Sequence, residues 1–151
     1  MRHAVGWIVI LAAILSPVLA RAEDKEKPDA ERIKGSWKLV SRIVKGVEAK
    51  ADSDQALQEV AFDDQGWKAK VGAKDATIDI TGTYFVDDKQ SPKLIDFTVK
   101  AGSNSIDVFA IYKFEKDQLF VRFRQGSGQR PVDFESTGDD LVTVVFAKAA
   151  D

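Results

Sequence analysis

From Gly35 onward, apolar residues alternate with polar ones at a period close to two. In residues 37–44, for example, Trp37, Leu39 and Ile43 alternate with Lys38 and Arg42. Turn-forming residues also recur roughly every 9 to 14 positions, a spacing typical of antiparallel hairpins whose strands bury one face. This patterning constrains the chain to an all-β fold.

Nine segments fit this pattern: residues 37–44, 60–63, 67–71, 76–86, 94–100, 106–114, 119–124, 132–136 and 141–147. Residues 45–56 form the longest polar connection, in which Asp52 could cap one turn of helix. Gly82 lies inside a predicted strand and indicates a bend or bulge. No segment provides a helix long enough for a parallel crossover, so we expect a single antiparallel barrel of eight to nine strands rather than a sandwich.

The first 22 residues predict a secretory signal peptide. A charged start at Arg2 precedes an apolar run over residues 4–15 and a small-x-small cleavage motif at residues 20–22. The run is shorter than the roughly 20 apolar residues of a membrane span, and no cysteine follows it to carry a lipid. We therefore expect cleavage near Ala22 and a secreted or periplasmic protein without a membrane anchor.

The rest of the chain predicts one domain preceded by a short leader. Residues 23–29 are charged apart from one proline, which indicates disorder. A helical turn with Asp29 as its N-cap is expected next, ending at Gly35. Residues 30–149 then form the barrel domain, because a chain of 151 residues suits a single core.

The mature chain contains neither imidazole nor thiol. The protein has no cysteine, and its one histidine, His3, leaves with the signal peptide. Nucleophilic sites that need histidine or cysteine, and zinc, haem or iron–sulfur sites with such ligands, are therefore excluded, and we predict no catalytic residues, metal or cofactor. Acidic and basic residues are interspersed and the acidic ones predominate, so nucleic acid is not expected as a partner.

Several segments in order carry a resemblance to a known family. They are residues 33–41 (Ile-Lys-Gly-Ser-Trp-Lys-Leu-Val-Ser), 82–84, 92–96, 111–112, 119–121 and 130–134. With these segments the chain resembles the lipocalin-like domains of secreted planctomycete proteins over nearly its whole mature length. The resemblance implies a calycin-like barrel in which Trp37 is buried at the closed end and an arginine from a late segment lies across its ring. Arg130 is the candidate, with Arg124 as the alternative, and such a contact contributes about 0.5 to 2 kcal/mol.

Five aromatic residues are candidates for lining the barrel interior: Trp67, Tyr84, Phe97, Tyr112 and Phe123. In a barrel of about eight strands these side chains either surround a ligand cavity or fill the core, and the sequence leaves both alternatives open.

The charged candidates have structural alternatives. Arg122 and Arg124 would face inward and anchor an anionic ligand if Phe120 points inward, but we favour the solvated orientation because an unpaired buried charge is costly. Carboxylate pairs at residues 63–64, 87–88 and 139–140 fall at predicted turns, where aspartate bonds nearby backbone N–H groups.

The sequence thus favours a secreted, non-enzymatic protein that binds a small apolar or amphipathic molecule in its barrel. The alternative is an interaction or inhibitor module with a filled barrel, which meets a protein partner through open-end loops at residues 45–56, 87–92 and 125–130. An enzyme that uses only carboxylate, amine, guanidinium or phenol groups is a third hypothesis.

Overall fold

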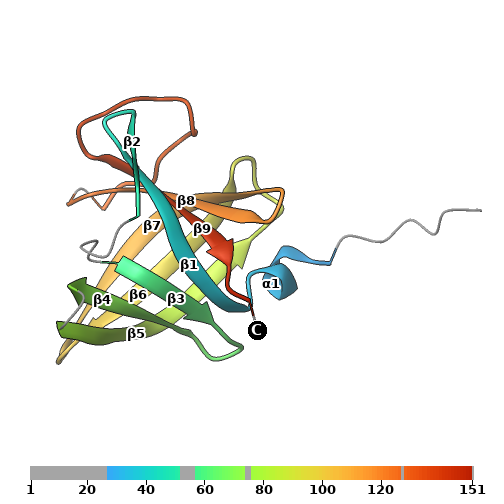
Figure 1. The fold of residues 1–151 in the computed structure, drawn as a ribbon. Coiled ribbons are helices and arrows are strands. Elements are labelled where there is room, and N and C mark those ends of the chain that lie inside the picture. Colours follow the sequence, from blue (N-terminus) through green and yellow to red (C-terminus); the bar gives the residue numbers. More distant parts are fainter. Residues whose placement is uncertain (1–26, 52–56, 74–75, 127, 151) are drawn as a thin grey trace, which may run out of the picture.

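The computed structural model describes residues 27–51, 57–73, 76–126 and 128–150 (Figure 1). Its elements are α1 (Asp29–Arg32), β1 (Gly35–Val44), β2 (Val47–Lys50), β3 (Leu57–Phe62), β4 (Trp67–Ala73), β5 (Ala76–Asp87), β6 (Lys93–Ala101), β7 (Asn104–Glu115), β8 (Gln118–Arg124) and β9 (Leu141–Lys148). The predicted signal peptide, residues 23–26 of the leader and the predicted helical turn at Asp52 lie outside the described residues.

The strands form a closed antiparallel barrel, as the alternating pattern predicted. Each strand from β3 to β8 pairs with the one that follows it, and β1 pairs with both β3 and β9 to close the ring. Trp37, for example, pairs with Val60 on one side and with Lys148 on the other. The barrel thus has eight strands, and β2 is an additional short strand on β1.

Alternate residues of each strand form the core. In β9, Val142, Val144 and Phe146 belong to the buried core cluster. On β8, Leu119 and Val121 belong to the same cluster and Phe123 packs against it, whereas Phe120 and Arg122 occupy the outer face. The period of two therefore assigns the inward rows correctly wherever the ladder is regular.

The two ends of the barrel differ. Helix α1 lies at one end with the turns after β3, β5 and β7 (Figure 1). Lys34, two residues after α1, forms a 2.5 Å ion pair with Asp64 in the first of these turns. The β1–β2 turn and the ends of β4, β6 and β8 lie at the opposite end. We call these the closed end and the open end. Residues 87–92 lie at the closed end, so their assignment to the open-end loops was wrong, because antiparallel strands place successive turns at alternate ends.

One predicted strand is absent. Residues 132–136 belong to an irregular connection between β8 and β9, which we call the β8–β9 loop (residues 125–140). Asp133 accepts backbone hydrogen bonds from Glu135 and Ser136, and this local turn competes with strand pairing. Pro131 also lacks the N–H that a ladder needs.

Candidate functional site

The barrel contains an apolar cavity of about 220 Å³ towards its open end. Its lining side chains come from all seven strands β3 to β9 and are Leu57, Val60, Phe62, Trp67, Ala69, Val71, Ile80, Phe97, Val99, Val108, Val121, Phe123, Val144 and Phe146. Every one of them is apolar or aromatic. They belong to the inward rows of their strands, so the alternating pattern of the sequence builds this wall directly.

Aromatic rings form one side of the cavity. Trp67 and Phe97 pack edge to face with their ring centroids 5.6 Å apart, and Phe62 lies 6.2 Å from Phe97. The indole Nε1 of Trp67 donates a 3.0 Å hydrogen bond to the backbone carbonyl of Thr83. Because this bond uses the only polar group of the indole, Trp67 presents an apolar surface to the cavity.

The rim of the cavity is also apolar. Ile78 precedes the lining residue Ile80 by two positions and is 65% exposed, while Ile106 precedes Val108 by two and is 57% exposed. Two-residue spacing places each isoleucine on the inward face of its strand, just beyond the cavity. The ladder between β5 and β6 ends at the pair Gly82 and Val99, although β5 begins six residues earlier, at Ala76. At the rim, β5 is thus no longer paired with β6, and the two isoleucines offer a ligand apolar surface there.

The structure brings three of the five predicted lining residues together. Trp67, Phe97 and Phe123 surround the cavity. Tyr84 packs against the core, but its hydroxyl donates to the carbonyl of Asp63 at 3.0 Å, at the closed end. Tyr112 also lies towards the closed end, so neither tyrosine lines the cavity. The remaining wall consists of aliphatic and small residues, which the sequence analysis missed because it considered only aromatic side chains. The two-residue spacing of Trp67, Ala69 and Val71 could have predicted that Ala69 and Val71 also face the barrel interior.

Trp37 is buried at the closed end, as predicted, with 3% of its surface exposed. Its Nε1 donates a 2.7 Å hydrogen bond to the carbonyl of Ile33, which attaches the indole to the residue after α1. The prediction that an arginine lies over the Trp37 ring was wrong. Lys148 lies there, with Nζ 4.5 Å from the ring centroid, because β9 pairs with β1 at this position. Arg130 lies elsewhere: it forms a bidentate ion pair with Asp96 and lies over Phe109 at 5.4 Å.

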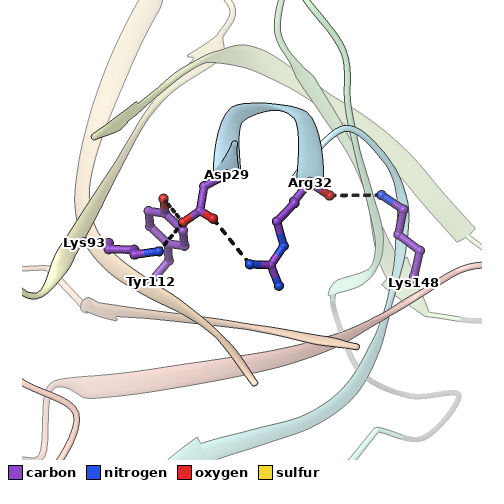
Figure 2. Close-up of polar contacts among 5 residues, drawn as sticks. All are labelled: Asp29, Arg32, Lys93, Tyr112 and Lys148. Atoms are coloured by element: carbon purple, nitrogen blue, oxygen red, sulfur yellow. Dashed lines mark hydrogen bonds and ion pairs between the residues drawn. The ribbon is translucent and has the colours of Figure 1, made fainter. Parts of the chain in front are cut away.

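A buried ionic cluster joins α1 to the barrel (Figure 2). Asp29 is only 5% exposed and accepts hydrogen bonds from the Tyr112 hydroxyl at 2.8 Å and from Lys93 Nζ at 2.6 Å. Arg32 lies 3.5 Å from its other oxygen. Asp29 is therefore not the predicted N-cap, a position that Pro28 occupies, and it belongs to the folded unit rather than to the leader.

The electrostatics of this cluster follow from its partners. Burial by itself raises the pKa of Asp29, but the hydrogen bonds from Lys93 and Tyr112 and the charges of Lys93 and Arg32 outweigh it and hold that pKa below its usual value. Burial, and then the hydrogen bond to Asp29, raise the pKa of Tyr112 well above that of a free phenol. At neutral pH a neutral phenol thus donates to a buried carboxylate.

Three arginines hold the β8–β9 loop against the outer face of the barrel. Arg122 donates to the carbonyl of Phe134 at 2.5 Å and to that of Ser136, and it is only 7% exposed. Arg124 and Arg130 form ion pairs with Asp140 and Asp96, respectively. Arg122 and Arg124 therefore face away from the barrel interior, as favoured, but the expectation that Arg122 is solvated was wrong, because the loop covers it.

Two of the predicted turn carboxylates cap turns, whereas Asp64, Asp139 and Asp140 form ion pairs with Lys34, Lys45 and Arg124, respectively. Asp63 accepts backbone N–H bonds from Gln65 and Gly66, and Asp87 accepts one from Lys89. Among the described residues, no group of three or more acidic, histidine or cysteine side chains is arranged to hold a metal ion. In the same part of the chain, no helix is long and apolar enough to cross a membrane.

The fold and the cavity define the class: a closed eight-stranded antiparallel barrel with an apolar interior site. No family model, curated protein or solved structure matches this chain. The geometry of the site therefore carries the functional argument.

Proposed function

We propose that this protein is a secreted or periplasmic, non-enzymatic binding protein that holds a small apolar molecule, or the apolar end of an amphipathic one, in its barrel. The observation that carries the proposal is the apolar cavity of about 220 Å³ with its apolar rim. Exposed isoleucines beside a cavity lose contact with water when a ligand covers them, and this burial favours binding.

The size of the cavity limits the ligand. An apolar cavity of about 150 Å³ is enough for one benzene molecule, whereas sites for drug-sized ligands begin at about 300 Å³. The cavity therefore suits a single ring system or a short acyl chain. A charged group inside it would lack a partner, so the polar end of an amphipathic ligand belongs at the rim.

The composition of the cavity wall supports binding rather than catalysis. None of its lining side chains is an acid, a base or a nucleophile. Catalysis needs such a group within hydrogen-bond reach of the substrate, directly or through one water molecule. A ligand held here meets only apolar surface.

The test is a titration of the purified protein with an environment-sensitive apolar dye, followed by competition with acyl chains of increasing length. Val108→Phe puts a larger side chain into the cavity, and the same change at Val47, which is 71% exposed on β2, is the matched control. We expect saturable dye binding that changes Trp67 fluorescence, is abolished by Val108→Phe and is unaffected by Val47→Phe. Circular dichroism verifies that both variants are folded.

Dye fluorescence that neither saturates nor depends on Val108 overturns the proposal. The alternative, an interaction or inhibitor module, then gains support if the folded protein captures a protein partner from its native extracellular fraction.

A further inference from the structure

A second hollow lies at the closed end of the barrel. It is a groove of about 440 Å³ among α1, the turn between β5 and β6, the strand β7 and the β8–β9 loop. Three cationic side chains line it: Arg32, Lys93 and Lys113. Their side chains are 24%, 41% and 37% exposed, so a molecule in the groove can reach all three.

The described residues that line the groove include no carboxylate. Asp29, the partner of Lys93 and Arg32, lies beneath them and is almost fully buried. Glu115 pairs with Lys113 at 2.5 Å but does not line the groove. Asp87 and Asp88, at and just after the end of β5, act electrostatically on the groove residue Tyr112, and Asp87 accepts hydrogen bonds from Lys89 and Gln90. Basic side chains thus line the groove directly, whereas the acidic ones lie beneath or beside it.

Aromatic rings stand beside these cations. Arg32 lies over the ring of Phe114 with 4.1 Å between the guanidinium carbon and the ring centroid, and Lys113 Nζ lies 4.8 Å from the centroid of Phe134. Both rings line the groove, as do the side chains of Ser91 and Tyr112. A ligand that fits this lining combines an oxyanion with a planar apolar body, because a simple inorganic ion would use only the cations.

We propose that this groove is a second binding site, selective for small aromatic carboxylates. The carboxylate would contact Lys93, Lys113 and Arg32, and the ring would lie against Phe114 and Phe134. The site is distinct from the apolar cavity, because the two share no lining residue. The proposal for the groove can therefore be tested separately from the proposed function.

The two tryptophans of the barrel distinguish the sites. Trp37 lies at the closed end, with its ring centroid 6.0 Å from that of the groove residue Phe114, whereas Trp67 lines the apolar cavity. We would titrate the ¹⁵N-labelled full-length protein with benzoate and follow the assigned indole N–H resonances of both residues. We expect saturable shifts at Trp37 and at the amides of residues 90–93, with Trp67 unchanged.

Matched ligands and variants test the role of charge. Benzyl alcohol, which keeps the ring but lacks the anion, should bind at least about tenfold more weakly than benzoate, as should inorganic phosphate, which lacks the ring. Lys113→Gln should weaken benzoate binding by about tenfold, the loss of one hydrogen bond to a charged group. Lys113→Arg should restore most of the affinity, and the same Lys→Gln change at the exposed Lys68 on β4 should have no effect.

Three results would overturn the proposal: no saturable shift at Trp37, equal affinity for benzoate and benzyl alcohol, or equal losses in Lys113→Gln and Lys68→Gln. Shifts at Trp67 alone would place the ring in the apolar cavity and count against the groove. If apolar dye binding fails while benzoate still shifts Trp37, the groove proposal holds without the proposed function.

Discussion

The hydroxyl of Tyr112 donates a 2.8 Å hydrogen bond to the carboxylate of Asp29, and this bond joins residues 83 positions apart in the chain. It connects α1 to the C-terminal part of β7. Because the carboxylate and the phenol are both buried, water cannot replace either group as a hydrogen-bond partner if the other is removed. The contact therefore ties the short helix to the barrel and covers the closed end.

Removing the Tyr112 hydroxyl should destabilise the protein measurably. Tyr112→Phe leaves the buried carboxylate with one hydrogen bond fewer, and we expect a loss of about 1 to 3 kcal/mol of unfolding free energy. Urea unfolding measures this loss. Tyr84→Phe is the control, because its hydroxyl donates to the carbonyl of Asp63 in a more exposed position and should cost less. Equal losses in the two variants would contradict a special role for the bond to Asp29.

The charge of Asp29 should make stability dependent on acid pH. Its native pKa lies below the unfolded value of about 3.9, so the unfolded state binds more protons and the contribution of Asp29 is lost as the pH falls through the native pKa. The stability difference between the wild type and Asp29→Asn should be largest above about pH 5 and shrink towards about pH 2.

Urea unfolding of both proteins across this range measures that difference. Other carboxylates with lowered pKa values, such as Asp63 and Asp140, remain in both proteins and cancel from the comparison. A difference that stays constant with pH would show that Asp29 acts through packing alone.

Gly82→Ala should destabilise the barrel more than a comparable change at a loop glycine. A Cβ at position 82 would lie 1.8 Å from the carbonyl oxygen of Thr98 and 2.8 Å from Nε1 of Trp67, so neighbouring strands would have to move. We expect a loss of about 3 kcal/mol by thermal unfolding.

Gly102→Ala is the control for this change. Gly102 has a φ of +63° but no neighbouring atom within 4 Å, so alanine there meets only backbone strain, about 1 to 2 kcal/mol. The β4–β5 ladder reaches Gly82 without a register shift, and the β5–β6 ladder ends at this residue. The predicted bulge is therefore absent from these ladders, and glycine at position 82 permits close approach of the strands. A Gly82→Ala variant as stable as Gly102→Ala would refute this.

Arg122→Met should loosen the β8–β9 loop. The change removes two hydrogen bonds to the carbonyls of Phe134 and Ser136, and we expect a loss of about 1 to 3 kcal/mol. Amide hydrogen exchange at residues 134–136 should become faster. Arg124→Met, which breaks a part-exposed ion pair with Asp140, should cost at most about 1 kcal/mol. Unchanged exchange in Arg122→Met would show that the loop is held by other contacts.

The local pattern of the sequence was sufficient for the class of fold. A period of two between turn residues defines antiparallel strands and their inward rows, because both depend on neighbours within the same segment. The resemblance carried by Gly35, Ser36 and Trp37 implied that Trp37 is buried, and the structure confirms that burial. Composition alone excluded sites that require cysteine, because the chain has none.

Tertiary structure decided which distant residues meet. Lys148 rather than Arg130 lies over Trp37 because the β1–β9 register sets that contact, and no local pattern encodes the register between strands a hundred residues apart. The local sequence predicted that Asp29 caps a helix, but its carboxylate accepts hydrogen bonds from Lys93 and Tyr112, which are distant in the sequence. Whether the barrel is hollow was equally undecided, because a cavity is the volume left when seven strands contribute their inward side chains together. That sum depends on register and barrel geometry, so only the folded structure reveals the 220 Å³ that remain.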